Sequence, residues 1–125
     1  MKLHLDKSNH PNRIQSCTRS GAGFVIRIDD QPHTSSLIIT PDRIIDWKVN
    51  NLSEIRSEDF RRIADINPEV VILGTGPVQE FPGPKVYLPL IEAGIGLEVM
   101  DTQAACRTYS ILLSDDRIIA AALIL

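Results

Sequence analysis

The sequence predicts one α/β domain with a partly parallel sheet and an extra β-meander on its N-terminal side. The chain has 125 residues, which fits one domain of ordinary size and leaves little room for a second. Short apolar runs separated by turn residues fill the first half of the chain. After residue 56, helical and strand patterns alternate, which is typical of a sheet that contains parallel strands.

Four short strands are predicted in the first half, joined as a β-meander. Phe24, Ile26 and Ile28 recur at every second position, so they should share one buried face of a strand. Pro41 begins a reversal of the chain, because its ring pre-sets the φ angle that the second position of a turn needs. The expected strands are residues 14–18, 24–29, 36–40 and 44–49, and the expected turns are residues 20–23, 30–33 and 41–42.

Helices alternate with strands in the second half. Ser57 is expected to cap a helix, because two acids follow it and complement the positive end of a helix dipole. The eight-residue apolar run that ends at Leu125 is too short to span a membrane and predicts a strand buried on both faces. The expected elements are a helix from Ser57 to Asn67-Pro68, a central strand over 70–73, a short helix over 90–93, a strand over 97–100, a helix over 102–113 and a strand over 118–125.

Composition and charge narrow the classes of function. Hydrophobic residues make up 43% of the chain and charged residues 23%, which is typical of a soluble globular protein. The chain has 13 basic and 16 acidic side chains, so its net charge is −3 and nucleic acid is not an expected partner. The two cysteines show no CxxC spacing, and the N-terminus lacks the apolar region of a signal peptide, so a cytoplasmic location is expected. Residues 1–13 are predicted to form a basic, solvated arm that precedes the domain at residues 14–125.

No catalytic residues, cofactor or metal site are predicted. Gly74-Thr75-Gly76 follows an apolar strand, but the prolines after it prevent the helix that a dinucleotide site needs. The three histidines, His4, His10 and His33, lack metal-ligand spacing and are interpreted as surface residues. Cys106 lies in a stretch of small residues and is interpreted as buried, although a pair formed by Cys106 and one of the histidines stays open.

One set of residues could bind a ligand. In an open α/β sheet, ligands bind outside the carboxyl ends of parallel strands. If the strands ending at Leu73 and Met100 are neighbours, the residues after them meet in one crevice. Thr102 would be the N-cap of the helix that starts there. The free N–H groups of this helix and a guanidinium would then suit a small anion. The candidate ligand-binding residues are Gly74, Thr75, Gly76, Asp101, Thr102 and Arg107. The alternative, which we favour, is that the glycines make a tight turn while Asp101 and Thr102 cap the helix.

Several segments along the chain match a known family in their order and spacing. They are Ser35 to Pro41, the strand around Trp47, Ile72 to Gly76, Gly94-Ile95, Glu98 to Thr102, Ala104 to Tyr109 and the terminal strand from Arg117 to Ile124. Together they resemble the Mth domain family, a domain of unknown function, over residues 14–125. The resemblance implies a single three-layer α/β domain with a mixed central sheet.

The resemblance also implies a class of function. The family contains small bacterial and archaeal proteins of unassigned role, and the mitochondrial assembly factor three of NADH dehydrogenase (complex I) is related to it. We therefore expect a non-enzymatic binding or assembly-factor module whose partner is another protein. This hypothesis predicts an exposed apolar patch or groove, with Phe81-Pro82-Gly83-Pro84 as its expected place. The alternative hypothesis is a small-molecule (anion) binding protein, or an undiscovered enzyme, with its site at the crevice.

Overall fold

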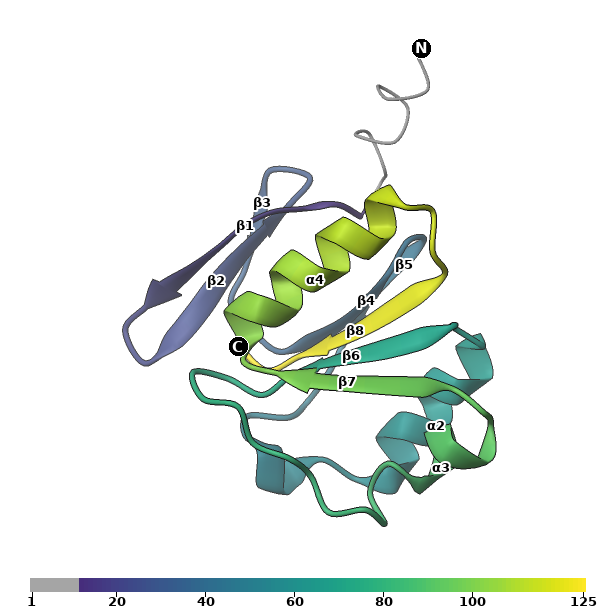
Figure 1. Ribbon diagram of the computed structural model, residues 1–125. Coiled ribbons are helices and arrows are strands. Elements are labelled where there is room, and N and C mark those ends of the chain that lie inside the picture. Colours follow the sequence, from purple (N-terminus) through teal and green to yellow (C-terminus); the bar gives the residue numbers. More distant parts are fainter. Residues whose placement is uncertain (1–11) are drawn as a thin grey trace.

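A five-stranded mixed sheet and a three-stranded antiparallel sheet form the framework of the protein (Figure 1). The structure is a computed structural model that describes residues 12–125. Most of the predicted arm, with His4 and His10, lies outside the described residues. The predicted α/β class with a mixed central sheet and an N-terminal meander is confirmed.

The three-stranded sheet contains β1 (Ile14–Ser20), β2 (Gly23–Ile28) and β3 (Gln31–His33) in that order. The alternate residues of β2 are buried, as predicted. The expected turn over residues 30–33 is wrong after Asp30, because β3 begins at Gln31 and pairs with β2. The reversal is made by Asp29 and Asp30 alone, both with positive φ, which suits a two-residue hairpin. Pro32 is tolerated because β3 is an edge strand.

The five-stranded sheet has the order β5-β4-β8-β6-β7. Its strands are β4 (Leu37–Thr40), β5 (Arg43–Asp46), β6 (Val70–Gly74), β7 (Gly96–Met100) and β8 (Ile119–Leu123). β4 pairs antiparallel with β5 and with β8, whereas β6 pairs parallel with β7 and with β8. The predicted meander is therefore divided between two sheets. The predicted strand over 44–49 ends earlier, at Asp46, which pairs with Leu37 at the start of β4; beyond this pair the N–H of Trp47 donates to the carbonyl oxygen of Ser36 at 3.1 Å.

The helices are the 3-10 turn η1 (Leu52–Glu54), α2 (Ser57–Ile66), α3 (Leu88–Glu92) and α4 (Thr102–Ser114). Ser57 is the first residue of α2 rather than its cap, which corrects the prediction. The N–H of Arg56 donates instead to the Asp59 carboxylate at 2.8 Å, so an acid in the first turn holds the start of the helix. Asn67 ends α2 in the left-handed conformation, where the sequence predicted the end.

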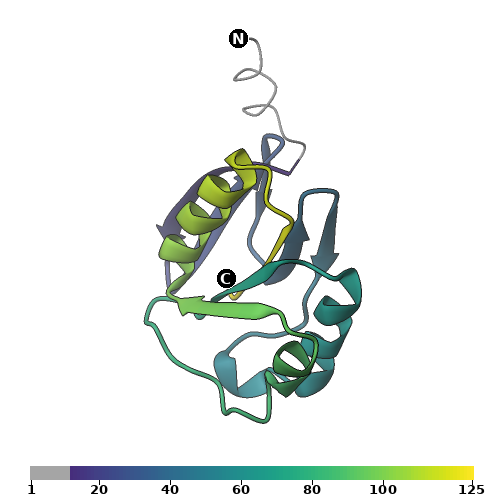
Figure 2. The same cartoon turned by 45° about the vertical axis from the view of Figure 1, so that its right-hand side comes forward.

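Two apolar clusters fill the two faces of the five-stranded sheet. α4 and the three-stranded sheet cover one face, and α2 and α3 cover the other (Figure 2). β8 contributes to both clusters in alternation, with Ala121 and Leu123 on the α4 side and Ala120 and Ala122 on the α2 side. The predicted burial of this strand on both faces is confirmed. Within residues 12–125, no helix combines the length and the apolar character needed to cross a bilayer.

Candidate functional site

The structure brings together most of the residues predicted to form a crevice. β6 and β7 are parallel neighbours, and Gly74 at the end of β6 pairs with Met100 at the end of β7. The N–H of Thr75 donates to the carbonyl oxygen of Met100 at 2.9 Å. The segments after the two strands therefore meet at one rim of the sheet, as the sequence predicted.

The side chain of Thr102 lies at the centre of this rim and is fully buried. Its hydroxyl accepts a hydrogen bond from the N–H of Gly76 at 2.8 Å and donates to the carbonyl oxygen of Ile124 at 2.8 Å. The N–H of Thr102 donates to the carbonyl oxygen of Gly76 at 2.9 Å. Thr102 thus joins the loop after β6, the start of α4 and the end of β8.

Asp101 is the N-cap of α4, which corrects the prediction that Thr102 takes this place. Its carboxylate accepts a hydrogen bond from the N–H of Ala104 at 3.0 Å. The negative charge also complements the positive end of the helix dipole. The carboxylate of Asp101 therefore already occupies the N-terminus of α4, as expected from the alternative in which Asp101 takes part in capping the helix.

Thr75 fixes the start of the loop that follows β6. Its hydroxyl donates to the carbonyl oxygen of Val78 at 2.6 Å and accepts from the N–H of Glu80 at 3.2 Å. Gly76 has a φ of 98°, in the region that favours glycine. At Gly74, a Cβ would lie 3.0 Å from the Cβ of Ala105, so α4 can approach β6 closely only because this residue has no side chain.

Arg107 does not join the other five candidates at the rim. It lines a separate hollow of about 480 Å³ between β1 and α4, together with Cys17 and Cys106. Binding of an anion by the six candidate residues stays a prediction. It would require the hydrogen bonds of Thr102 and Gly76 to open.

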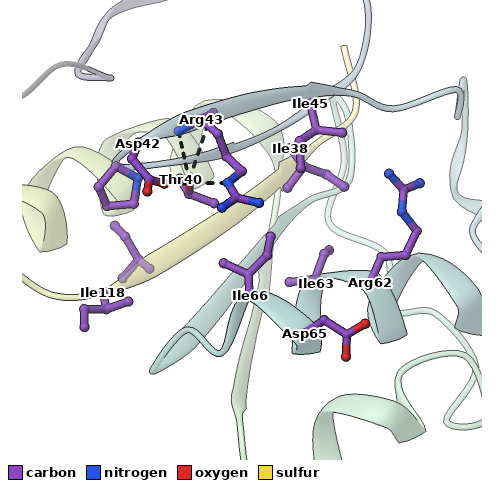
Figure 3. A pocket seen from close by; sticks show the side chains of 12 residues that line it. Ile38, Thr40, Asp42, Arg43, Ile45, Arg62, Ile63, Asp65, Ile66 and Ile118 are labelled. Carbon is purple, nitrogen blue, oxygen red and sulfur yellow. Dashed lines mark hydrogen bonds and ion pairs between the residues drawn. The ribbon is translucent and has the colours of Figure 1, made fainter.

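A larger hollow, of about 670 Å³, lies between the β4–β5 turn and α2 (Figure 3). Six of its twelve lining residues are isoleucines, and four are charged. The lining includes Ile38, Ile45, Ile63, Ile66, Ile118, Asp42, Arg43, Arg62 and Asp65. The sequence analysis missed this hollow because its walls come from elements that are far apart in the chain. The sequence signal that could have indicated this hollow was Ile66, which lies one turn beyond the buried Ile63 on α2.

Exposed apolar side chains gather on the connection from β6 through α3. Seven large hydrophobic side chains are exposed within residues 12–125, and four of them belong to this connection: Val78, Phe81, Leu88 and Ile91. Phe81 is 69% exposed and borders a hollow of about 430 Å³ that Leu52 and Ile55 also line. The sequence predicted exposed apolar surface near Phe81, and the structure places it there. Such surface is typical of protein-interaction sites.

Metal ligation finds no support among the described residues. Within residues 12–125, no three His, Cys, Asp or Glu side chains come together as a metal ion would require. His33 ends the edge strand β3 and is half-buried.

Comparisons with known proteins agree with the fold. A family model described as "Protein of unknown function (DUF498/DUF598)" matches residues 17–124. The chain is 34% identical over 109 residues to a protein of Xenopus tropicalis named NADH dehydrogenase (ubiquinone) 1 alpha subcomplex assembly factor 3. This match covers 86% of the chain and 58% of the frog protein, so the chain spans about three fifths of that relative.

Two solved structures of Bordetella proteins share the architecture. A crystal structure from Bordetella parapertussis has a TM-score of 0.77 at 33% identity, covering 88% of this chain and 94% of that one. A solution structure from Bordetella pertussis, described as a Mth938-like domain, has a TM-score of 0.79 at 28% identity. It covers 98% of this chain and 91% of that one, so nearly the whole fold is shared.

Proposed function

Because this chain belongs to the DUF498/DUF598 family, whose Mth-like fold it shares, we propose that it is a non-enzymatic module that binds other proteins during assembly. The resemblance to the Mth domain family found in the sequence is confirmed. The frog relative is named as an assembly factor of NADH dehydrogenase. We extend that role to this chain, with subunits of a respiratory NADH dehydrogenase as the partner class.

The observation that carries this proposal is the exposed apolar connection between β6 and α3. Phe81 presents a large aromatic side chain to solvent, and Pro82 and Pro84 restrict the backbone beside it. A rigid segment loses little conformational entropy on binding, so an aromatic anchor held in this way favours association. The hollow beside Phe81 would receive a side chain of the partner.

A cytoplasmic location is part of the same proposal. Cys17 and Cys106 are both unpaired thiols in the described structure. Thiols persist in the reducing conditions of the cytoplasm.

Affinity purification with two matched variants tests the proposal. The tagged chain is incubated with a lysate of its source organism, and bound proteins are identified by mass spectrometry. Phe81→Ser removes the anchor, whereas Ile111→Ser removes an apolar side chain of similar exposure on α4, at 63% against 69%. We expect the unchanged chain and Ile111→Ser to enrich the same NADH dehydrogenase subunits, and Phe81→Ser to lose at least tenfold in enrichment.

Thermal melts accompany this experiment, because both substitutions lie on the surface and should leave Tm nearly unchanged. Absence of any reproducible partner for the unchanged chain would contradict the assembly role. Equal enrichment by all three chains would contradict the place assigned to Phe81.

A further inference from the structure

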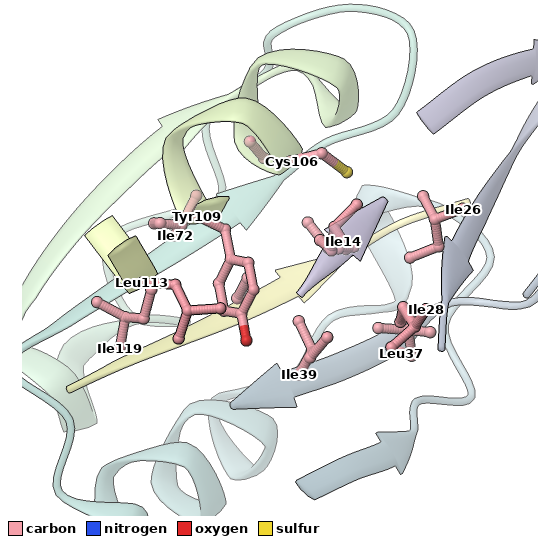
Figure 4. Close-up of a cluster of buried hydrophobic side chains, with 13 residues drawn as sticks. Ile14, Ile26, Ile28, Leu37, Ile39, Ile72, Cys106, Tyr109, Leu113 and Ile119 are labelled. Atoms are coloured by element: carbon pink, nitrogen blue, oxygen red, sulfur yellow. The ribbon is translucent and has the colours of Figure 1, made fainter. Parts of the chain in front are cut away.

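The only two cysteines of the chain meet between β1 and α4. Cys17 lies on β1 and Cys106 on α4, and their thiols are neighbours at the same hollow. The side-chain amide of Gln103 donates to the carbonyl oxygen of Cys17 at 3.5 Å, which holds β1 against the helix at this point. In Figure 4 the sulfur of Cys106 points away from α4, toward the side of the three-stranded sheet.

The two thiols differ in their access to solvent. Cys106 is 3% exposed and belongs to the apolar cluster beneath α4. Cys17 is half-buried, and both cysteines border the hollow of about 480 Å³ that Arg107 also lines. A small reagent can therefore enter the hollow and reach Cys17 first.

The surroundings also make Cys17 the first thiol to ionise. Burial raises the pKa of both thiols. At Cys17 the Cys106 thiol and the Arg107 guanidinium lower the pKa, whereas the negative charge of Asp101 raises it by a smaller amount. At Cys106 the neighbouring Cys17 raises the pKa further, and this effect exceeds the lowering by Arg107, so Cys106 keeps its proton.

We propose that Cys17 and Cys106 form a dithiol site that low-molecular-weight disulfides oxidise to a cross-link between β1 and α4. The Cys17 thiolate attacks one sulfur of the external disulfide and forms a mixed disulfide, while the first external thiolate leaves. That thiolate takes the proton of Cys106, whose sulfur then attacks the Cys17 sulfur and expels the second external thiolate. The chain loses two protons and two electrons, and the external disulfide takes them up and becomes two thiols.

The cross-link would fasten the three-stranded sheet to the helix that covers the central sheet. Because the two cysteines are far apart in the sequence, the bond would also restrict the unfolded chain over a long loop. The oxidised protein should therefore melt at a higher temperature than the reduced protein, and a dithiol reductant should reverse the shift.

Mass spectrometry of the folded protein with hydroxyethyl disulfide tests the proposal. This reagent is small enough for the hollow, and the reaction is run at mildly alkaline pH. We expect the unchanged chain to lose the mass of two hydrogens, to remain monomeric, and to yield a peptide that joins Cys17 to Cys106. Disulfide-linked dimers, two separate adducts or an unreactive folded chain would overturn it.

Two variants assign the roles of the thiols. Cys106→Ala should stop at one stable mercaptoethanol adduct on Cys17, because the second thiol is missing. Cys17→Ala should stay at least tenfold less reactive than Cys106→Ala while folded, and should react fully in denaturant. Faster reaction of Cys17→Ala than of Cys106→Ala in the folded state would reverse the assignment of the nucleophile. Since the unchanged chain is scored by its own cross-linked peptide, a poorly folding variant leaves the main result standing.

Discussion

The buried hydroxyl of Thr102 provides hydrogen bonds that no other side chain at the rim supplies. Replacing Thr102 with valine keeps the shape of the side chain but leaves the N–H of Gly76 and the carbonyl oxygen of Ile124 without this partner. Because unsatisfied buried groups cost more than an average hydrogen bond contributes, we expect a loss of about 2–4 kcal/mol in the free energy of unfolding.

Urea unfolding measures this change, with Thr18→Val as the control. Thr18 is exposed on β1, so its replacement should change the free energy of unfolding by less than about 0.5 kcal/mol. Equal effects of the two substitutions would show that the rim does not depend on the Thr102 hydroxyl.

The phenol of Tyr109 makes stability depend on pH in the alkaline range. Tyr109 is fully buried beneath α4 (Figure 4), and its hydroxyl donates to the carbonyl oxygen of Asn12 at 3.2 Å. Burial raises its pKa above the ordinary tyrosine value, so the folded state holds the proton more tightly than the unfolded state does. This contribution to stability is complete below pH ~10 and is lost progressively as the pH rises above it.

Comparison with Tyr109→Phe isolates this contribution from the other groups that titrate in the same range. We expect the unchanged chain to be more stable than the variant at neutral pH by about 1 kcal/mol, the typical value of one hydrogen bond. The difference should shrink and then change sign as urea unfolding is repeated above pH ~10. A difference that stays constant across the alkaline range would contradict the assignment.

Among the connecting elements, the turn after β6 depends on the backbone of one glycine. A Cβ at Gly76 would meet no atom within 4 Å, so we attribute the loss of stability expected for Gly76→Val to the positive φ of this residue. We expect a loss of roughly 1–3 kcal/mol. Gly83→Val is the matched control, because Gly83 is equally open but lacks a positive φ. If both variants melt like the unchanged chain, the turn does not need glycine.

At the scale of elements, local signals predicted most of the structure. The alternation in β2, the apolar run of β6 and the end of α2 at Asn67 were all visible in the sequence. Cap positions were less visible, because Asp101 and Thr102 are both good N-caps and only the contacts of Thr102 with Gly76 and Ile124 decide between them.

At the scale of the whole molecule, strand assignment depends on contacts that no local pattern reports. The hairpin of β4 and β5 looked like a continuation of the meander, yet it joins β8 from the far end of the chain. The parallel neighbours β6 and β7 were predicted correctly because alternating helices and strands favour that arrangement. The sequence alone could not place Arg107, because the position of its side chain depends on how β1 packs against α4.

β8 joins the antiparallel and the parallel parts of the central sheet. Ala121 pairs with Ile39 of β4 on one side and with Ile72 of β6 on the other. Ala121→Pro removes an N–H from a central strand and adds a ring that the neighbouring strands cannot accommodate. We expect the cooperative thermal transition to be lost.

Ala121→Gly is the control for this substitution. It keeps the N–H and should cost about 1–2 kcal/mol, which leaves a measurable transition. A folded Ala121→Pro chain with a normal melt would contradict the central position of β8.

The central position of β8 in the sheet also affects when the chain can fold during synthesis. While the chain is being synthesised, the hairpin of β4 and β5 and the pair of β6 and β7 emerge first, with their inner edges unpaired. The sheet can close only after residues 119–123 have left the ribosome. Until then Ile38, Ile39 and Ile72 lack their partners on β8 and remain open to chaperones and to other nascent chains, so folding of this domain cannot be completed before β8 has emerged.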